Sequence, residues 1–313
     1  MFGISKWIRP EYLSTGDTVA LISPATKVKH EYVEGAVKYM ESIGLRPIVM
    51  PGCDSTPSGS FAATLRHRLS DFEMALRSSD VKCIFCCRGG YGVQQLLPYV
   101  SVDEVRKNPK WIVGFSDISA FHAAWAEAKV YSLHAPMAKH IATKGNDLYT
   151  KATFDLLCGR ETDYRVKVAA DPLNVSGKAA GRLLGGNLAV LNGLAATKFD
   201  IFNERDADDY IFFIEDVGEN IYEIDRILTR LFMTGALNKM KALIVGDFSD
   251  YAPDLNYASM NEMISSRLSV MGVDIPVAFG FPIGHGDRNM PMMCGAEVKL
   301  KVDANGSELS FKL

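Results

Sequence analysis

The sequence of 313 residues lacks several features that would place it in a special class of protein. No apolar run approaches the roughly 20 residues needed to span a bilayer. The first seven residues lack the long apolar stretch of a secretory signal. A net charge of −3 gives no electrostatic reason to expect binding to nucleic acid or to an anionic membrane. We therefore expect a cytoplasmic protein with no nucleic-acid or membrane partner.

Cysteine is scarce, and its spacing fits neither a disulfide framework nor a metal site. Six cysteines are scattered along a large chain without an export signal, which indicates free thiols. Cys83, Cys86 and Cys87 resemble half of a zinc motif, but no second cysteine or histidine pair follows at a suitable spacing. Within a buried strand, cysteine more often acts as a small hydrophobe. We expect no structural zinc, no catalytic metal and no cofactor.

The length of the chain predicts two domains. A chain of 313 residues exceeds what one compact core usually spans. Hydrophobic residues make up 48% and charged residues 23%, which is ordinary for a soluble globular protein. We expect an N-terminal domain over 1–160, a linker over 161–178 where the apolar pattern weakens, and a C-terminal domain over 179–313.

The first half of the chain alternates β-rich runs with amphipathic helical stretches. The pattern predicts strands at 18–23, 46–50, 81–86 and 111–115, and helices near 31–42, 64–78 and 118–128. This succession implies right-handed βαβ units and an α/β domain with a parallel sheet, Rossmann-like or flavodoxin-like, covered on both faces. Sites in such sheets form beyond the carboxyl ends of the strands. The functional loops should therefore follow Ser23, Cys86 and Phe115.

The second half mixes strands and helices less regularly. It begins with the segment 181–187, after which we expect a helix to about 196, and it closes with a hairpin turned at 303–306. The other predicted elements are strands at 210–214, 242–246 and 276–281, and helices near 221–234 and 257–271.

The segment Gly114-Phe115-Ser116-Asp117 stands where a buried strand gives way to a helix. A nucleophile at such a position is lifted on a tight turn, and the helix N-terminus stabilises developing negative charge. Ile118 occupies the place of the second glycine of a nucleophile elbow. A Ser-Asp pair that opens a helix is also an ordinary N-cap. This segment alone leaves both interpretations open and favours the cap.

The segment Arg88-Gly89-Gly90-Tyr91-Gly92 follows another predicted strand. Glycines let backbone N–H groups approach a ligand, so the loop is suited to binding a phosphate or an oxyanion. It lacks the Lys-Ser/Thr ending of a P-loop and the Gly-x-Gly-x-x-Gly spacing, which disfavours nucleotide binding. A plain tight turn is the alternative.

Two further segments carry residues suited to acid–base chemistry. Glu215 directly follows an apolar strand, where a partly buried carboxylate needs a partner such as histidine. Asp216 and Glu219 fit dipole or capping roles before a helix that begins at Ile221. His285 lies between two glycines just past a strand, where a titratable imidazole is suited to act as a general base.

Together these motifs resemble the LD-carboxypeptidase family of serine peptidases, whose best-known members are murein tetrapeptide carboxypeptidases. The resemblance covers almost the whole chain, and seven motifs occur in the family's order. They are Gly16-Asp17-Thr18-Val19-Ala20 with Ser23-Pro24-Ala25, Arg88-Gly89-Gly90-Tyr91-Gly92, Gly114-Phe115-Ser116-Asp117, Gly185-Gly186-Asn187-Leu188, Glu215-Asp216-Val217-Gly218-Glu219, Asp225-Arg226 and Gly284-His285-Gly286. The chain departs from the pattern at Ser119, where threonine is common, and at Cys86-Cys87, where small residues are commoner.

The resemblance implies a catalytic triad in which Ser116 is the nucleophile, His285 the base and Glu215 the residue that orients the histidine. It also implies an oxyanion hole built from the backbone N–H groups of Gly90 and Asp117. The fold it implies is an N-terminal parallel-sheet α/β domain followed by a C-terminal domain rich in β-structure with flanking helices.

The substrate that the resemblance implies is a small muropeptide, cut between the L-centre of a diamino acid and a terminal D-alanine during cell-wall peptide recycling. A carboxypeptidase must recognise a free carboxylate, for which Arg88 or the glycine-loop amides are candidates. One alternative is a hydrolase of aminoacyl- or peptidyl-nucleotide amides, as in the microcin-resistance branch of the family; the form of the loop 88–92 favours the first. Another is a peptide-binding relative without catalysis, which the intact Ser116, Glu215 and His285 argue against. The oligomeric state stays open, with a homodimer as one option.

Overall fold

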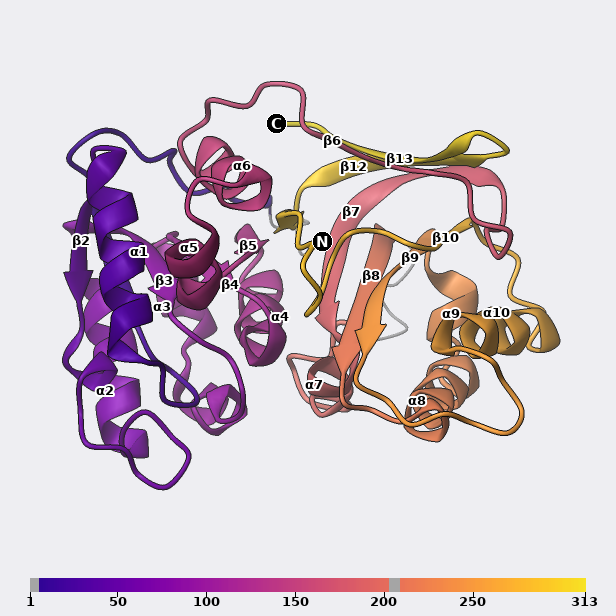
Figure 1. Cartoon of the computed structure of the whole chain (residues 1–313), viewed down its shortest axis with the longest axis horizontal. Helices are drawn as coiled ribbons and strands as arrows, with labels where there is room; N and C mark the ends of the chain where they lie inside the picture. Colours follow the sequence, from indigo (N-terminus) through magenta and orange to yellow (C-terminus); the bar gives the residue numbers. More distant parts are fainter. Residues whose placement is uncertain (1–5, 203–208) are drawn as a thin grey trace, which may run out of the picture. The chain divides into compact units, whose positions relative to one another are not determined.

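The computed structural model describes residues 6–202 and 209–313, which form two compact units. Unit 1 consists of Met1–Thr162 together with Met290–Gly295. Unit 2 consists of Asp163–Asn289 together with Ala296–Leu313. The chain thus returns to unit 1 for a short segment before it completes unit 2 (Figure 1).

Unit 1 is built on a six-stranded sheet with the order β11-β5-β4-β3-β1-β2. Its strands are β1 (Thr18–Ile22), β2 (Arg46–Val49), β3 (Val81–Cys86), β4 (Trp111–Gly114), β5 (Ser132–His134) and β11 (Met292–Cys294). Neighbouring strands run parallel from β2 to β5, and β11 pairs antiparallel with β5. Every residue of β1 and β4 is buried, as expected for the central strands of a sheet covered on both faces.

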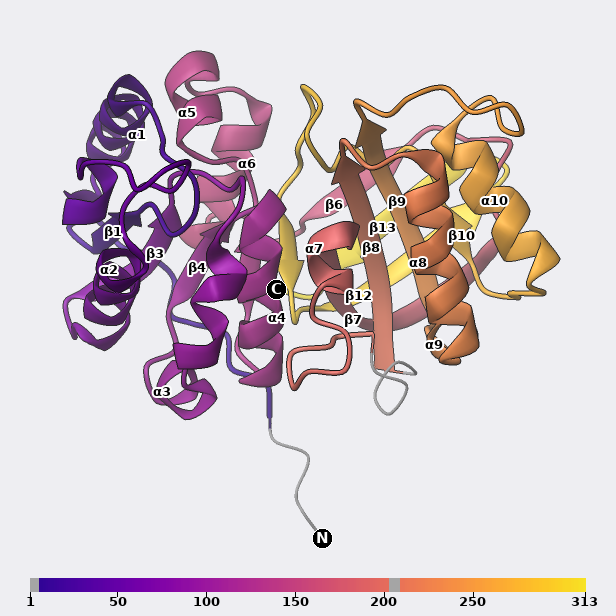
Figure 2. The ribbon, with the colours of Figure 1, turned by 90° about the horizontal axis from the view of Figure 1, so that it is seen from below.

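Helices cover both faces of this sheet. Figure 2 shows α1 and α5 on one side of the strands and α2, α3 and α4 on the other. The helices are α1 (His30–Ser42), α2 (Leu65–Arg77), α3 (Val102–Lys107), α4 (Ser119–Glu127), α5 (Ala138–Lys144) and α6 (Leu148–Leu157), with 3-10 turns η1 (Pro51–Cys53), η2 (Val93–Gln95), η3 (Leu97–Tyr99) and η4 (Ser116–Ile118). The predicted parallel-sheet α/β fold of the N-terminal half is confirmed.

Unit 2 contains a seven-stranded mixed sheet with the order β10-β9-β8-β7-β12-β13-β6. Its elements are β6 (Arg165–Val168), β7 (Gly177–Asn187), α7 (Leu188–Asn192), β8 (Tyr210–Val217), α8 (Ile221–Met233), α9 (Ala236–Lys239), β9 (Ala242–Ser249), α10 (Met260–Val270), β10 (Val277–Ala278), β12 (Glu297–Asp303) and β13 (Gly306–Phe311). Strands β7 to β10 pair in parallel, whereas β12, β13 and β6 pair antiparallel. The β-rich fold with flanking helices that the resemblance implied is thereby confirmed. None of the helices in 6–202 and 209–313 has the length and apolarity of a membrane span.

Two local predictions for the second half were wrong. The helix expected after residue 187 and up to about 196 is only five residues long, Leu188–Asn192, and the segment 181–187 before it ends an 11-residue strand. The segment is extended because it pairs with β8 on one side and with β12 on the other. A Cβ at Gly185 would clash with the carbonyl oxygen of Phe213, so glycine is needed at this position. The strand expected over 276–281 shrinks to two residues. The expected linker 161–178 contains the strand β6, which pairs with β13.

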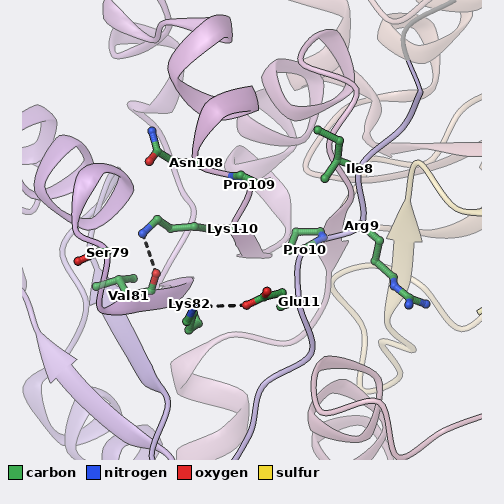
Figure 3. Close-up of a pocket in the computed structure, with 10 residues that line it drawn as sticks. All are labelled: Ile8, Arg9, Pro10, Glu11, Ser79, Val81, Lys82, Asn108, Pro109 and Lys110. Atoms are coloured by element: carbon green, nitrogen blue, oxygen red, sulfur yellow. Dashed lines mark hydrogen bonds and ion pairs between the residues drawn. The ribbon is translucent and has the colours of Figure 1, made fainter.

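The amino ends of β3 and β4 border a pocket of about 390 Å³ (Figure 3). Lys110 lies on its wall, is 6% exposed, and donates to the carbonyl oxygens of Ser78 and Val81, the latter at 2.6 Å. Ser78 is the C-cap residue of α2, so the ammonium group satisfies a carbonyl that the helix end leaves without an intrahelical partner. The pocket contains none of the residues predicted to be catalytic, which follow the carboxyl ends of the same strands.

We expect Lys110→Met to lower the free energy of unfolding of unit 1 by about 1–3 kcal/mol, because the buried carbonyl group of Val81 and the partly buried one of Ser78 lose a charged donor. Urea denaturation followed by tryptophan fluorescence measures this, since the three tryptophans, at positions 7, 111 and 125, all belong to unit 1. Lys107→Met is the control: its side chain is 71% exposed and lies 3.6 Å from Glu104. An equal loss in both variants would contradict the capping role of Lys110.

Candidate active site

Ser116 lies on a sharp turn between β4 and α4. Its φ of +65° is in the left-handed region, which costs a residue other than glycine about 1–3 kcal/mol and is often found at functional sites. Gly114, two residues earlier, has φ +152°, and a Cβ there would lie 2.9 Å from Cγ1 of Ile118 and 3.2 Å from Cβ of Cys86. Gly114 therefore leaves room for the isoleucine that follows the turn. The geometry is that of a strained strand-to-helix turn that presents a serine.

The structure does not support the alternative that Ser116 is a helix N-cap. The N-cap of η4 is Phe115 and that of α4 is Ile118, and neither makes a side-chain capping hydrogen bond. The side chain of Asp117 does not cap this helix either, because its Oδ2 accepts from the backbone N–H of Val93 at 2.8 Å.

The glycine loop 88–92 lies directly against this turn. A Cβ at Gly89 would lie 2.9 Å from Cβ of Ser116 and 3.1 Å from the backbone nitrogen of Asp117, so only glycine permits this approach. Gly90 has φ +99°, and a Cβ there would clash with the Thr26 hydroxyl. Among the hydrogen bonds of the described residues, none uses the N–H of Gly90 as a donor. That N–H is available to bind a ligand oxygen.

In unit 2, His285 and Glu215 form a hydrogen bond of 2.8 Å between Nδ1 and Oε2. The Glu215 side chain is completely buried at the end of β8, whereas the imidazole keeps 19% exposure. Because an ionised carboxylate can only accept, Nδ1 carries the proton, and Nε2 keeps the lone pair with which a general base takes a proton. The structure thus brings together two of the three predicted triad residues within one unit; Ser116 belongs to the other.

Glycines also allow this pair to form. The register of β8 and β9 shifts beside Glu215, and a Cβ at Gly246 in the shifted region would lie 2.5 Å from the Ile283 carbonyl oxygen. Gly284 has φ +134°, and a Cβ there would lie 3.1 Å from Oε2 of Glu215. The loop that carries His285 therefore packs closely against β9 and the carboxylate. Irregularities of this kind in a strand commonly lie next to active sites.

The charges around His285 outweigh its burial. Burial lowers the pKa of the imidazole, but the hydrogen bond and charge of Glu215, with the charges of Asp216 and Asp250, raise it, and the net result is a pKa above the ordinary 6.5. Burial also raises the pKa of Asp216, to about 7, and the charge of Glu215 raises it further. The hydrogen bonds that Asp216 accepts from N–H groups lower this pKa, but they do not cancel the effect of burial.

Asp216 caps a different helix from the one expected. Its Oδ2 accepts from the N–H of Ala189, and its Oδ1 from the side chain of Asn187, both at 2.8 Å, so it stabilises the N-terminus of α7. The N-terminus of α8 has its own capping box, formed by Asn220 and Glu223. Asp216 does act as a capping residue, as predicted, but it caps α7 and not the predicted helix that begins at Ile221.

The remaining predicted residues have simpler surroundings. Arg88 is exposed and donates to the carbonyl oxygen of Lys27 at 2.7 Å. Burial and the nearby Glu223 raise the pKa of Glu219. Cys83, one of the cysteines considered for zinc, is buried in β3, and no cluster of metal-ligating side chains occurs in 6–202 or 209–313.

Comparison with known proteins identifies the family. Residues 19–135 match the LD-carboxypeptidase N-terminal domain, and residues 180–300 match the LD-carboxypeptidase C-terminal domain. The chain is 30% identical over 296 residues to a probable murein peptide carboxypeptidase of Bacillus subtilis, covering 93% of this chain and 91% of the relative. It is 25% identical to the microcin C7 self-immunity protein MccF of Escherichia coli, covering 96% and 94%.

A solved structure agrees with these matches. The crystal structure of muramoyltetrapeptide carboxypeptidase from Oxalobacter formigenes superimposes with a TM-score of 0.82 at 27% identity, covering 95% of this chain and 99% of that one. This chain belongs to the LD-carboxypeptidase family. The resemblance inferred from its motifs is confirmed.

Sequence reasoning missed one prominent group beside the glycine loop. Arg68 on α2 is buried and contacts this loop through its guanidinium group. Its neighbours in sequence, Arg66 and His67, are charged or polar residues on the same helix, so no local pattern marks position 68 as buried.

If His285 acts as the general base, its imidazole must be neutral, and its pKa is raised. We therefore expect kcat/KM to fall with decreasing pH along a limb whose midpoint lies above 6.5. Glu215→Gln should move this limb to lower pH, since the carboxylate that stabilises the imidazolium is lost. A pH–rate profile of both proteins measures the midpoints. A limb that stays at the same pH in the variant would contradict the assignment of this titration to the His285–Glu215 pair.

Proposed function

We propose that the protein is a serine-type LD-carboxypeptidase that hydrolyses the amide bond before the terminal D-alanine of murein tetrapeptides. The observation that carries the proposal is the buried Glu215–His285 hydrogen bond of 2.8 Å. The left-handed conformation of Ser116 supports it from the other unit. Family membership supplies the reaction class, and murein peptide carboxypeptidases among the relatives supply the substrate class.

In the proposed mechanism, Nε2 of His285 takes the proton of Ser116 as the hydroxyl attacks the scissile carbonyl carbon. Glu215 holds the imidazole in the required tautomer and stabilises the imidazolium that forms. The imidazolium then protonates the leaving amine of D-alanine, and an acyl-enzyme remains. A water molecule, activated by the same histidine, hydrolyses this ester and releases the shortened peptide.

The oxyanion of the tetrahedral intermediate is held, in this proposal, by the backbone N–H groups of Gly90 and Asp117. The approach of Gly89 to the backbone nitrogen of Asp117 supports a shared location for the two donors. Loss of one such donor typically costs about 10²–10³ in rate. Arg88, exposed next to the loop, is the proposed partner of the substrate carboxylate.

A second candidate function is hydrolysis of an aminoacyl-nucleotide amide. The similarity to MccF over 96% of the chain favours keeping it. Both candidates use the same nucleophile and base and differ in the substrate. A third candidate, a peptide-binding protein without catalysis, would bind the tetrapeptide without turning it over.

Incubation of the purified protein with murein tri-, tetra- and pentapeptides and with an aminoacyl sulfamoyl adenosine, followed by mass spectrometry, tests the proposal. We expect tetrapeptide to lose one D-alanine and Ser116→Ala to abolish this reaction, because no other group replaces the nucleophile. Circular dichroism checks that the variant is folded. Cleavage of the nucleotide conjugate alone would favour the second candidate, and turnover by the folded Ser116→Ala variant would refute the nucleophile.

We expect Glu215→Gln to lower kcat far more than Glu219→Gln does. An amide at position 215 no longer stabilises the imidazolium, and the corresponding substitution in a serine protease triad lowers kcat about 10⁴-fold. Glu219 is a matched control, since it lies four residues away on the same segment and has no hydrogen bond to His285 among those of the described residues. Steady-state kinetics on the tetrapeptide compare the two. Equal losses would mean that the wrong carboxylate has been assigned.

A further inference from the structure

Arg68 lies buried beneath the glycine loop, and its guanidinium group is hydrogen-bonded to several segments of unit 1. It is 1% exposed, although arginine is almost never fully buried without partners. Its guanidinium group makes four hydrogen bonds. Their acceptors come from the loop after β1, the residue before the N-cap of α2, and the segment after β3.

These four bonds use the shape of the guanidinium group. Nη1 donates to the carbonyl oxygens of Pro24 and Gly92 at 2.7 and 3.0 Å, and Nε donates to that of Ala63 at 3.3 Å. Nη2 donates to Oε1 of Gln95 at 2.7 Å. All N–H donors of the guanidinium group except one on Nη2 are therefore engaged, and they point in several directions within one plane. Lysine presents its donors at a single point and does not reproduce this fork.

The contact with Gly92 connects Arg68 to the proposed oxyanion hole. A Cβ at Gly92 would lie 2.7 Å from Nη1, so the loop backbone rests directly on the guanidinium group. The next residue, Val93, donates its N–H to Oδ2 of Asp117 at 2.8 Å. Asp117 is the residue whose own backbone N–H is a proposed oxyanion donor. Arg68 is thus linked to that donor through two residues of the loop.

Thr26 binds the loop at the residues next to Gly90. Its hydroxyl accepts from the N–H of Tyr91 at 3.0 Å, and its own N–H donates to the carbonyl oxygen of Gly89 at 3.2 Å. Gly90, the second proposed donor, therefore lies between two residues that are both bonded to Thr26. Arg68 fixes the loop one residue further along, at Gly92.

Electrostatics couples Arg68 to Asp117 as well. Burial lowers the pKa of Arg68, and the charge of Asp117 opposes this shift. Burial raises the pKa of Asp117 to about 6, and the hydrogen bond from Val93 and the charge of Arg68 oppose it. Each group therefore helps to keep the other ionised in a site from which water is largely excluded.

We propose that Arg68 is a positioning residue for the oxyanion hole: it does not touch the substrate, but fixes the loop so that the N–H groups of Gly90 and Asp117 converge on the scissile carbonyl. The inference rests on the proposed function. A displacement of about 1 Å at a reacting centre is enough to cost roughly 10² in rate. The effect should therefore appear in the transition state and not in the binding of the ground state.

The test compares Arg68→Met and Arg68→Lys with Arg77→Met. Arg77 is the matched control because it lies on the same helix, is 61% exposed, and pairs with Glu73 only at 3.9 Å. For each variant, kcat and KM are measured on the tetrapeptide, and inhibition constants are measured for two ligands. One is the tripeptide product; the other is a phosphonate peptide whose tetrahedral phosphorus replaces the scissile carbonyl.

We expect both Arg68 variants to lower kcat about 10²-fold with KM and tripeptide affinity unchanged, and to weaken phosphonate binding by the same factor as kcat/KM. Arg77→Met should match the parent protein. Tryptophan fluorescence in urea checks folding, and Arg68→Lys carries the test if the methionine variant does not fold. Parental kcat in a folded Arg68 variant would overturn the inference, as would equal weakening of tripeptide and phosphonate.

These outcomes are separable from failure of the proposed function. If the folded Ser116→Ala variant still turns over the tetrapeptide, the serine mechanism itself is wrong. If Ser116→Ala is inactive and the Arg68 variants keep the parental kcat, only the positioning role of Arg68 is wrong.

Discussion

The hydrogen bond between Glu215 and Nδ1 of His285 is the interaction on which the proposed chemistry of this protein depends. A carboxylate with no solvent exposure needs a partner, and the imidazole supplies one. The same bond selects the tautomer of the imidazole and raises its pKa. Neither effect would survive if β9 and the loop of His285 could not approach the end of β8. Backbone packing at Gly246 and Gly284 is therefore as necessary as the ionisable groups themselves.

A similar dependence on close backbone approach occurs at Ser116, the proposed nucleophile. Ser116 is held in a left-handed conformation, and the loop of Gly89 fits against it with no room for a side chain. In the proposed mechanism, each unit contributes groups that hydrogen bonds and close packing already position, so that few dipoles need to reorganise during the reaction. The buried Arg68 adds a hydrogen bond to the same loop at Gly92. Strain at one serine is compensated by many ordinary contacts around it.

Much of the fold could be predicted because its signals are local. The strand at 81–86 and the helix near 31–42 follow from an apolar run and an amphipathic pattern, and the structure has both. The triad and the oxyanion donors were assigned by resemblance; local pattern alone favoured an N-cap for Ser116. What could not be predicted depends on partners distant in sequence. The long strand β7 forms because β8 and β12 flank it, and the burial of Arg68 results from acceptors supplied by three separate loops.

The return of residues 290–295 to unit 1 has a consequence for biosynthesis. Strand β11 closes the edge of the first sheet by pairing with β5, yet it follows most of unit 2 in the sequence. While the ribosome is still making unit 2, the nascent first sheet presents an open edge with unpaired amide and carbonyl groups. Such an edge is a template for pairing with another chain. Truncation before residue 290 should leave the same edge permanently unpaired. The first half of this polypeptide therefore does not contain the complete first sheet.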